Sequence, residues 1–218
     1  MIETSVVSGN TPTLGALSLR TLCSLAALVL AANVASARAD ESFTVKAAVY
    51  AGGGLSIPLG PSDFKDGWEQ GWSAGGGIGY RLSPRSEIRT LMFHNRFDLD
   101  TAGLSGITGG EYTVLEMSVD YKLYVTGLRS DDLLATYLVV GVGFGGSTNA
   151  SATFPEPLGS TEKFSEAKLA YDLGGGVDLR ALPRTAIFAE AKWDLIRTHD
   201  ENTTYMPLRA GIRFLIAD

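Results

Sequence analysis

The stretch Tyr112-Thr-Val-Leu-Glu-Met-Ser-Val-Asp-Tyr-Lys-Leu-Tyr-Val125 indicates the fold class, because its side chains alternate in character at every second position. The apolar positions include Leu115, Met117 and Val119. The positions between them carry Glu116, Asp120 and Lys122. Successive side chains of a β-strand point to opposite faces, whereas a helical stripe repeats every 3.6 residues. The stretch therefore predicts a strand with one face toward lipid and the other toward a packed polar lumen.

Seven other stretches have strand-like composition, and two of them, 169–180 and 186–196, alternate almost as clearly. In 88–97 the alternation breaks between Ile88 and Leu91, so we expect either a β-bulge or a misjudged strand boundary there. The eight predicted strands are 43–55, 72–82, 88–97, 112–125, 133–144, 169–180, 186–196 and 206–216.

The connections between these strands alternate between long and short. The long ones are 58–67, 98–110, 147–163 and 199–203, and the short ones are 83–85, 127–132 and 181–184. An even number of antiparallel strands with alternating long loops and short turns is typical of small transmembrane β-barrels. The sequence thus predicts an all-β fold, an eight-stranded antiparallel up-and-down barrel. Its long loops would face outside, and its turns and both termini would face the periplasm.

The first 39 residues have the features of a secretory signal peptide. Arg20 precedes an apolar run, 22–32, and small residues follow it, which predicts cleavage after Ala39. An uncleaved membrane anchor is the alternative, although the apolar run is short for a membrane-spanning helix. We therefore expect a signal peptide over 1–39 and one barrel domain over 40–218. The only cysteine, Cys23, would leave with the leader, so the exported chain would close without disulfides.

The glycine-rich stretch Trp72-Ser-Ala-Gly-Gly-Gly-Ile-Gly-Tyr80-Arg-Leu-Ser83 and the closing stretch Tyr205-Met-Pro-Leu-Arg-Ala-Gly-Ile-Arg-Phe214 add a resemblance. Region 40–218 resembles the outer-membrane protein beta-barrel family, whose relatives include the OmpA-type and OmpX-type eight-stranded barrels. The resemblance implies a bacterial outer-membrane location. It also implies outer-membrane lipid, the barrel-assembly machinery and periplasmic chaperones as partners. The net charge of −6 argues against nucleic acid as a partner.

Charged residues on the predicted lumen faces are the main candidate site. An eight-stranded barrel is just wide enough for its own side chains, which favours a paired ionic plug and a structural or surface-interaction role. The alternative is a narrow porin-like channel for ions or for small or hydrophobic solutes. The predicted lumen charge network consists of Glu116, Asp120, Lys122, Lys168, Asp172, Asp178, Arg180, Glu190, Lys192, Asp194, Arg209 and Arg213.

Two histidines raise a third hypothesis, a lipid-modifying enzyme active at the rim of the barrel. His94 and His199 each precede acidic residues near the predicted outer ends of strands, but no His-Ser motif accompanies either. We therefore expect no enzyme, no catalytic residue, no cofactor and no metal. The loop 149–162 is long enough to recognise an extracellular partner.

Aromatic residues are expected to form two belts at the membrane interfaces. The predicted outer belt consists of Trp68, Trp72, Phe93, Phe97, Tyr112, Trp193 and Tyr205, and the inner belt of Phe43, Tyr80, Tyr121, Tyr124 and Phe214.

Overall fold

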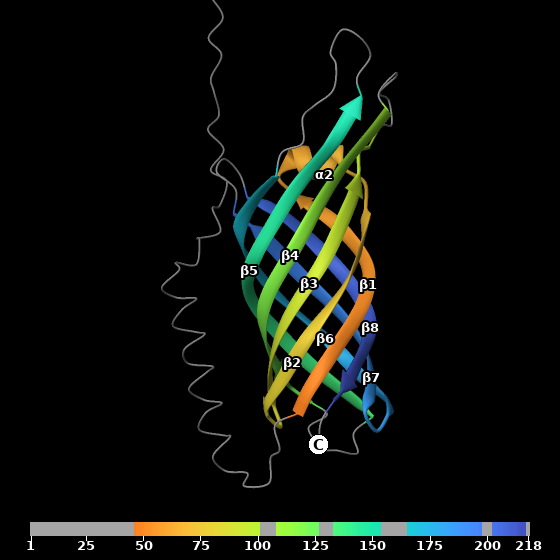
Figure 1. Ribbon diagram of the computed structural model, residues 1–218, viewed down its shortest axis with the longest axis vertical. Coiled ribbons are helices and arrows are strands. Elements are labelled where there is room, and N and C mark those ends of the chain that lie inside the picture. The colour runs from red at the N-terminus through yellow and green to blue at the C-terminus, as the bar shows by residue number, and fades with distance from the viewer. Residues whose placement is uncertain (1–45, 101–107, 127–132, 154–164, 198–201, 217–218) are drawn as a thin grey trace, which may run out of the picture.

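The computed structural model describes residues 46–100, 108–126, 133–153, 165–197 and 202–216 as a closed barrel of eight antiparallel strands (Figure 1). Each strand pairs with its neighbours in sequence, and the last pairs with the first, which confirms the predicted fold class. The predicted signal peptide lies outside the described residues. The strands are β1 (Lys46–Gly60), β2 (Gly71–Ser83), β3 (Ser86–Asp98), β4 (Thr108–Tyr124), β5 (Leu134–Thr153), β6 (Ser165–Leu182), β7 (Thr185–Ile196) and β8 (Thr203–Leu215).

The outer wall of the barrel is apolar, as the alternation in β4 predicted. Leu115, Met117 and Val119 are each about half exposed, whereas Glu116 and Asp120 are buried inside. A wall of exposed large apolar side chains around a closed sheet suits a lipid environment, where every backbone group must be paired within the protein. Across the described parts of the chain, no helix combines the length and apolar character that crossing a membrane requires.

The predicted bulge in the third strand is wrong. β3 pairs with β4 without interruption from Ser86 opposite Leu123 to Asp98 opposite Glu111. Leu91 is buried in the interior, and the outward positions of β3 include the exposed Met92. The alternation appeared to break because β3 places apolar side chains on both of its faces.

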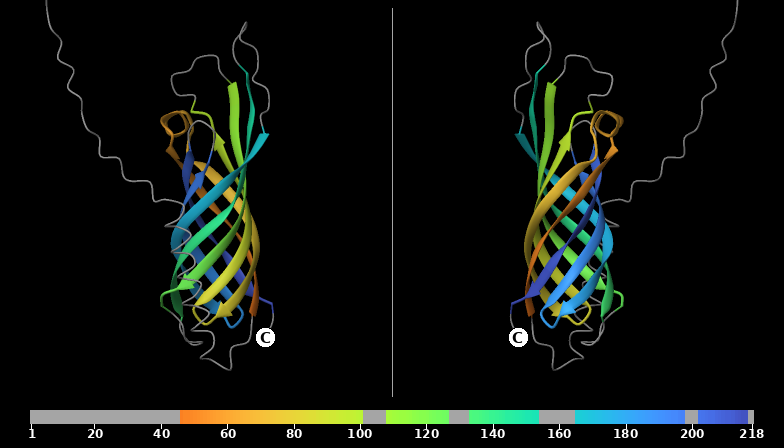
Figure 2. Two further views of the ribbon diagram at one scale, coloured as in Figure 1. Left: turned by 90° about the vertical axis from the view of Figure 1, so that its left-hand side faces the viewer. Right: turned by 90° about the vertical axis from the view of Figure 1, so that its right-hand side faces the viewer.

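The long connections are shorter than the sequence predicted, because the strands continue into them. β1 runs to Gly60 and is followed by a short helix, α2 (Ser62–Gly67), which lies over one end of the barrel (Figure 1). β4 and β5 remain paired as far as Thr108 opposite Thr153 and project beyond the other strands (Figure 2). We call this end the loop end, and the opposite end, where the short connections lie, the turn end.

Glycines in the strands permit close approach between neighbouring backbones. A Cβ atom at Gly54 in β1 would overlap the backbone carbonyl oxygen of Leu208 in β8. Gly146 in β5 differs, since the nearest atom to an added Cβ would be the carbonyl oxygen of Leu115 at 3.8 Å. The barrel therefore tolerates a side chain at one of these positions and not at the other.

We expect Gly54→Ala to lower the free energy of unfolding by about 1–3 kcal/mol, because β1 and β8 must move apart to accommodate the methyl group. Gly146→Ala is the matched control, with an expected change within about 0.5 kcal/mol. Urea unfolding of the barrel in lipid vesicles, followed by tryptophan fluorescence, measures both. Equal stability of the two variants would contradict the close packing of β1 on β8.

Candidate functional site in the barrel interior

Ten of the twelve predicted lumen charges are buried inside the barrel. The other two, Lys168 and Arg180, lie on the interior face of β6 near its opposite ends and are partly exposed. The ten buried residues are Glu116, Asp120, Lys122, Asp172, Asp178, Glu190, Lys192, Asp194, Arg209 and Arg213.

Two buried charges of the described residues were missed by the sequence analysis, Glu87 and Arg89 of β3. Both are at most 1% exposed. They were missed because the predicted strand began at Ile88 and its two faces were not distinguished. An unbroken alternation counted back from the buried Asn95 would have placed both on the interior face.

Arg89 is at the centre of the interior network. Its Nη2 lies 3.0 Å from Asp120 Oδ2 and 2.6 Å from Glu190 Oε2, so that one guanidinium links β3 to both β4 and β7. Lys192 Nζ lies 3.3 Å from the same oxygen of Asp120. Asp120 is thus paired with two cationic side chains, one from β3 and one from β7.

A second group of polar side chains lies toward the loop end, around Glu116. Glu116 Oε2 accepts hydrogen bonds from Arg209 Nη2 at 2.9 Å and from the Tyr205 hydroxyl at 3.0 Å. Arg209 also donates to Asn95 Oδ1, which accepts a further bond from the Ser56 hydroxyl. These bonds join β1, β3, β4 and β8 across the lumen.

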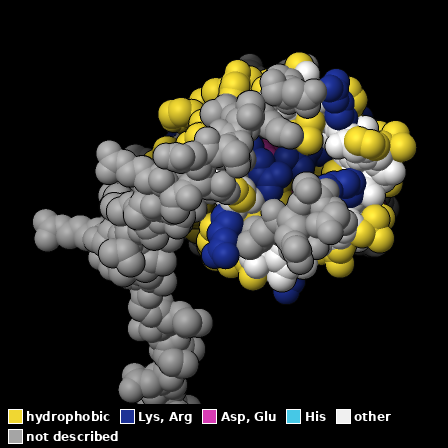
Figure 3. Space-filling model, turned by 90° about the horizontal axis from the view of Figure 1, so that it is seen from below, with side chains coloured by type: hydrophobic (Ala, Val, Ile, Leu, Met, Phe, Trp, Pro, Cys, Tyr) yellow, Lys and Arg dark blue, Asp and Glu magenta, His cyan; other side chains and the backbone are white. Residues whose placement is uncertain are grey.

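A third group lies toward the turn end and is balanced in charge. Lys122 Nζ is 2.9 Å from Asp178 Oδ2, and Arg213 bridges Asp178 at 3.4 Å and Glu87 at 3.2 Å. The Tyr50 hydroxyl donates to Glu87, and the Tyr124 hydroxyl donates to Asp178. Two acids therefore face two bases, with hydroxyl donors filling the remaining positions. Viewed from the turn end, basic side chains are visible at the centre of the molecule, and its edge is mostly hydrophobic with a few basic side chains (Figure 3).

An apolar layer covers the network at the loop end. Phe64 of α2 is buried and packs edge-on against Phe97, with ring centroids 5.1 Å apart. Phe97 in turn contacts Tyr205 at 5.8 Å. Trp68 and Tyr112 pack at the margin of this cluster, which also includes Val114, Ala170 and Ile196.

Four residues predicted for the interfacial belts are buried inside the barrel instead, and two more, Trp68 and Tyr112, pack against the loop-end cluster. Phe93, Phe97, Tyr124 and Tyr205 are all at most 3% exposed. The prediction failed for these residues because it used their position along the barrel axis and not the face of the strand on which they lie. The predicted belt residues Trp72, Tyr80, Trp193 and Phe214 do lie on the outer wall, and Phe144 of β5 joins them; each is exposed by 40% or more.

His94, the one histidine among the described residues, is not accompanied by a hydrolase-like set of side chains. His94 lies in β3 opposite Ala74 of β2 and Leu115 of β4, and its ring packs against Trp72 with the centroids 5.2 Å apart. His199 lies outside the described residues. The site that the structure assembles is therefore the charged interior.

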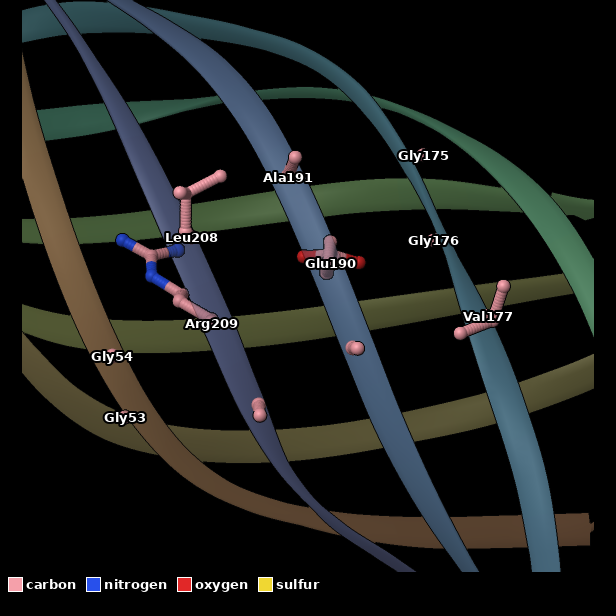
Figure 4. A pocket seen from close by; sticks show the side chains of 11 residues that line it. Gly53, Gly54, Gly175, Gly176, Val177, Glu190, Ala191, Leu208 and Arg209 are labelled. Atoms are coloured by element: carbon pink, nitrogen blue, oxygen red, sulfur yellow. The ribbon is translucent and has the colours of Figure 1, made fainter.

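A shallow depression of about 490 Å³ lies across β1, β6, β7 and β8 (Figure 4). Its lining contains many small residues, among them Gly53, Gly175, Ala189, Ala191 and Ala210. Ala189, Ala191 and Ala210 are exposed. They belong to the apolar outer wall, where they leave room beside larger side chains for the hydrocarbon of a membrane.

Removal of the Arg89 guanidinium should be strongly destabilising, because Asp120 and Glu190 would lose a buried partner. We expect Arg89→Met to lower the free energy of unfolding by about 3–5 kcal/mol. The control is Arg96→Met at a solvent-exposed pair with Asp98 and Glu111, with an expected cost of about 0–1 kcal/mol. Urea unfolding in vesicles compares the two. A similar cost for both variants would show that the interior network is not a stabilising unit.

No known protein-family profile matches the chain, and no curated protein matches its sequence. Solved structures do match it. One is Neisserial surface protein A (NspA), at 13% identity and a TM-score of 0.56, with 79% of this chain and 99% of that one covered. Another is a major outer membrane protein from Thermus thermophilus, at 14% identity and a TM-score of 0.52, with 80% of this chain and 100% of that one covered. At the level of fold, these matches confirm the resemblance: the chain has the eight-stranded β-barrel fold of these two proteins.

Proposed function

We propose that the chain spans a bacterial outer membrane as a barrel with a closed lumen, and that its role is structural or one of surface interaction. The observation that carries this proposal is the filled interior. Beneath α2, buried side chains continue from the aromatic cluster through the charged network to the tyrosines of the turn end.

The interior is closed by both apolar and ionic contacts. Tyr124, Tyr137 and Val139 form a buried cluster toward the turn end, and Lys122 Nζ lies 3.7 Å above the centroid of the Tyr137 ring. Eight strands enclose little more space than their side chains fill. A solute would have to separate several ion pairs that are shielded from water, at a cost of several kcal/mol per ion.

The loop end supplies the features that favour surface interaction. The β4–β5 ribbon extends the sheet beyond the barrel, so that its backbone forms a projecting platform (Figure 2). The helix α2 adds exposed charged residues, including Asp63, Lys65 and Asp66. An extracellular partner would meet these elements first. On the periplasmic side, the barrel-assembly machinery and chaperones would meet the chain before insertion.

The purified barrel should give no steady single-channel steps in planar lipid bilayers, because its ion pairs and apolar layers obstruct the lumen. An open porin inserted into the same bilayers serves as the control for detection. Reproducible steps that scale with the amount of inserted protein would contradict the closed lumen and favour the narrow channel instead.

The orientation can be tested with single cysteines, because Cys23 is the only native one. In a Cys23→Ser background, Asp66→Cys lies in α2 and Arg85→Cys lies in the exposed β2–β3 turn. A membrane-impermeant maleimide should label position 66 in intact cells and position 85 only after the outer membrane is permeabilised. The reverse pattern would contradict the proposed topology.

A further inference from the structure

Between the aromatic cluster of the loop end and the balanced group of the turn end lies a middle layer, which includes the Arg89 and Glu116 groups. Among the described residues, this layer contains more buried acids than buried bases. This inference rests on the closed interior of the proposed function. The three buried bases of the middle layer are Arg89, Lys192 and Arg209. The five buried acids are Glu116, Asp120, Asp172, Glu190 and Asp194.

The three bases already form ion pairs with four of these acids. Arg89 binds Asp120 and Glu190. Arg209 binds Glu116 at 2.9 Å. Lys192 Nζ lies closest to Asp172, at 3.0 Å, and is 3.3 Å from Asp120 and 3.5 Å from Glu116.

Asp194 remains without a close partner. Its residue is 2% exposed, and neither of its carboxylate oxygens receives a hydrogen bond. The nearest cation in an ion pair with it is Arg209, at 4.0 Å, the outer limit for such a contact. A buried ionised carboxylate without donors is costly, so either a bound proton or a cation beside it must neutralise the charge.

The unpartnered Asp194 carboxylate points into a cluster of acids from three strands. One carboxylate oxygen each from Glu116 of β4, Asp172 of β6 and Asp194 of β7 lies within 4.8 Å of the others. Gly141 of β5 makes room for this arrangement, because a Cβ there would overlap the carboxylate of Asp172. One oxygen of Asp120 nearby also lacks a hydrogen-bond donor.

From this geometry we infer that Glu116, Asp172 and Asp194 bind a divalent cation with the chemistry of Ca²⁺. Carboxylate oxygens are the ligands that Ca²⁺ prefers, and they can bind it through one or both oxygens. An excess of two acids over bases matches a charge of +2. The aromatic cluster of Phe97 and Tyr205 covers the cation on the loop side, and Tyr205 also holds Glu116 through its hydroxyl.

A cation at this position would stabilise the closed barrel, because it binds residues of β4, β6 and β7 that are adjacent only after folding. A ligand that binds only the folded state raises the free energy of unfolding. The covered position further implies that the cation enters while the barrel closes and leaves slowly afterwards.

The test uses the full barrel refolded in metal-free detergent, without added salt or with Ca²⁺, Mg²⁺ or Na⁺ at matched ionic strength. Ca²⁺ should raise the urea midpoint of the native chain and of the control Asp98→Asn, whose carboxylate is exposed. It should not raise the midpoint of Asp194→Asn. Asp172→Asn provides a second variant if Asp194→Asn does not fold.

Terbium luminescence, excited through tyrosine, gives a readout at the site itself. Ca²⁺ present during refolding should compete with Tb³⁺ for the site, and Asp194→Asn should weaken the binding of Tb³⁺ about tenfold or more. Equal Ca²⁺ effects in all variants would show surface binding and overturn the inference. The absence of any Ca²⁺ effect would also overturn the inference. If acidification then raised the stability of the native chain but not of Asp194→Asn, the cluster would hold a proton instead of a cation. Either result would leave the closed lumen intact, since conductance tests that separately.

Discussion

The pairing of β8 with β1 is the interaction on which the rest of the structure depends. It runs from Leu215 opposite Ala48 to Thr204 opposite Gly60 and removes the two free edges that an eight-stranded sheet would otherwise have. In hydrocarbon, an unpaired backbone N–H or C=O group costs several kcal/mol. Closure is therefore a condition for an apolar outer wall, and it also defines an interior that lipid cannot reach. The close approach of β1 and β8 around Gly54 belongs to the same constraint.

Closure also brings together charges that are remote in the sequence. Arg89 and Glu190 are 101 residues apart, and Glu87 and Arg213 are 126 apart, yet each pair meets across the lumen. Such pairs carry a large desolvation cost, which only close contact between the two charges can offset. Those contacts require all eight strands to be in register. The ionic interior thus opposes partial opening of the wall: displacement of one strand would leave several buried charges unpaired.

The interior is not uniform along the barrel axis. At the turn end, Glu87 and Asp178 are matched by Lys122 and Arg213, and tyrosine hydroxyls complete the hydrogen bonding. In the middle layer, acids outnumber bases, and Asp194 has no close donor. A barrel that only needed to fill its lumen could do so with balanced pairs or apolar residues at both levels. The imbalance distinguishes the middle layer as the part of the interior suited to a bound cation.

The sequence by itself determined the strand number, the antiparallel topology and ten of the buried charges, because a period of two assigns faces wherever one face is apolar and the other charged. It failed for 88–97, where both faces of β3 mix apolar and polar side chains, and it consequently missed Glu87 and Arg89. It also predicted loops where the β4–β5 ribbon and α2 stand, since apolar alternation is not required outside the membrane. Only the tertiary structure decided which charges are partners and that Asp194 has none within close range. Those contacts depend on strand register and barrel closure, and neither is encoded in the pattern of any single strand.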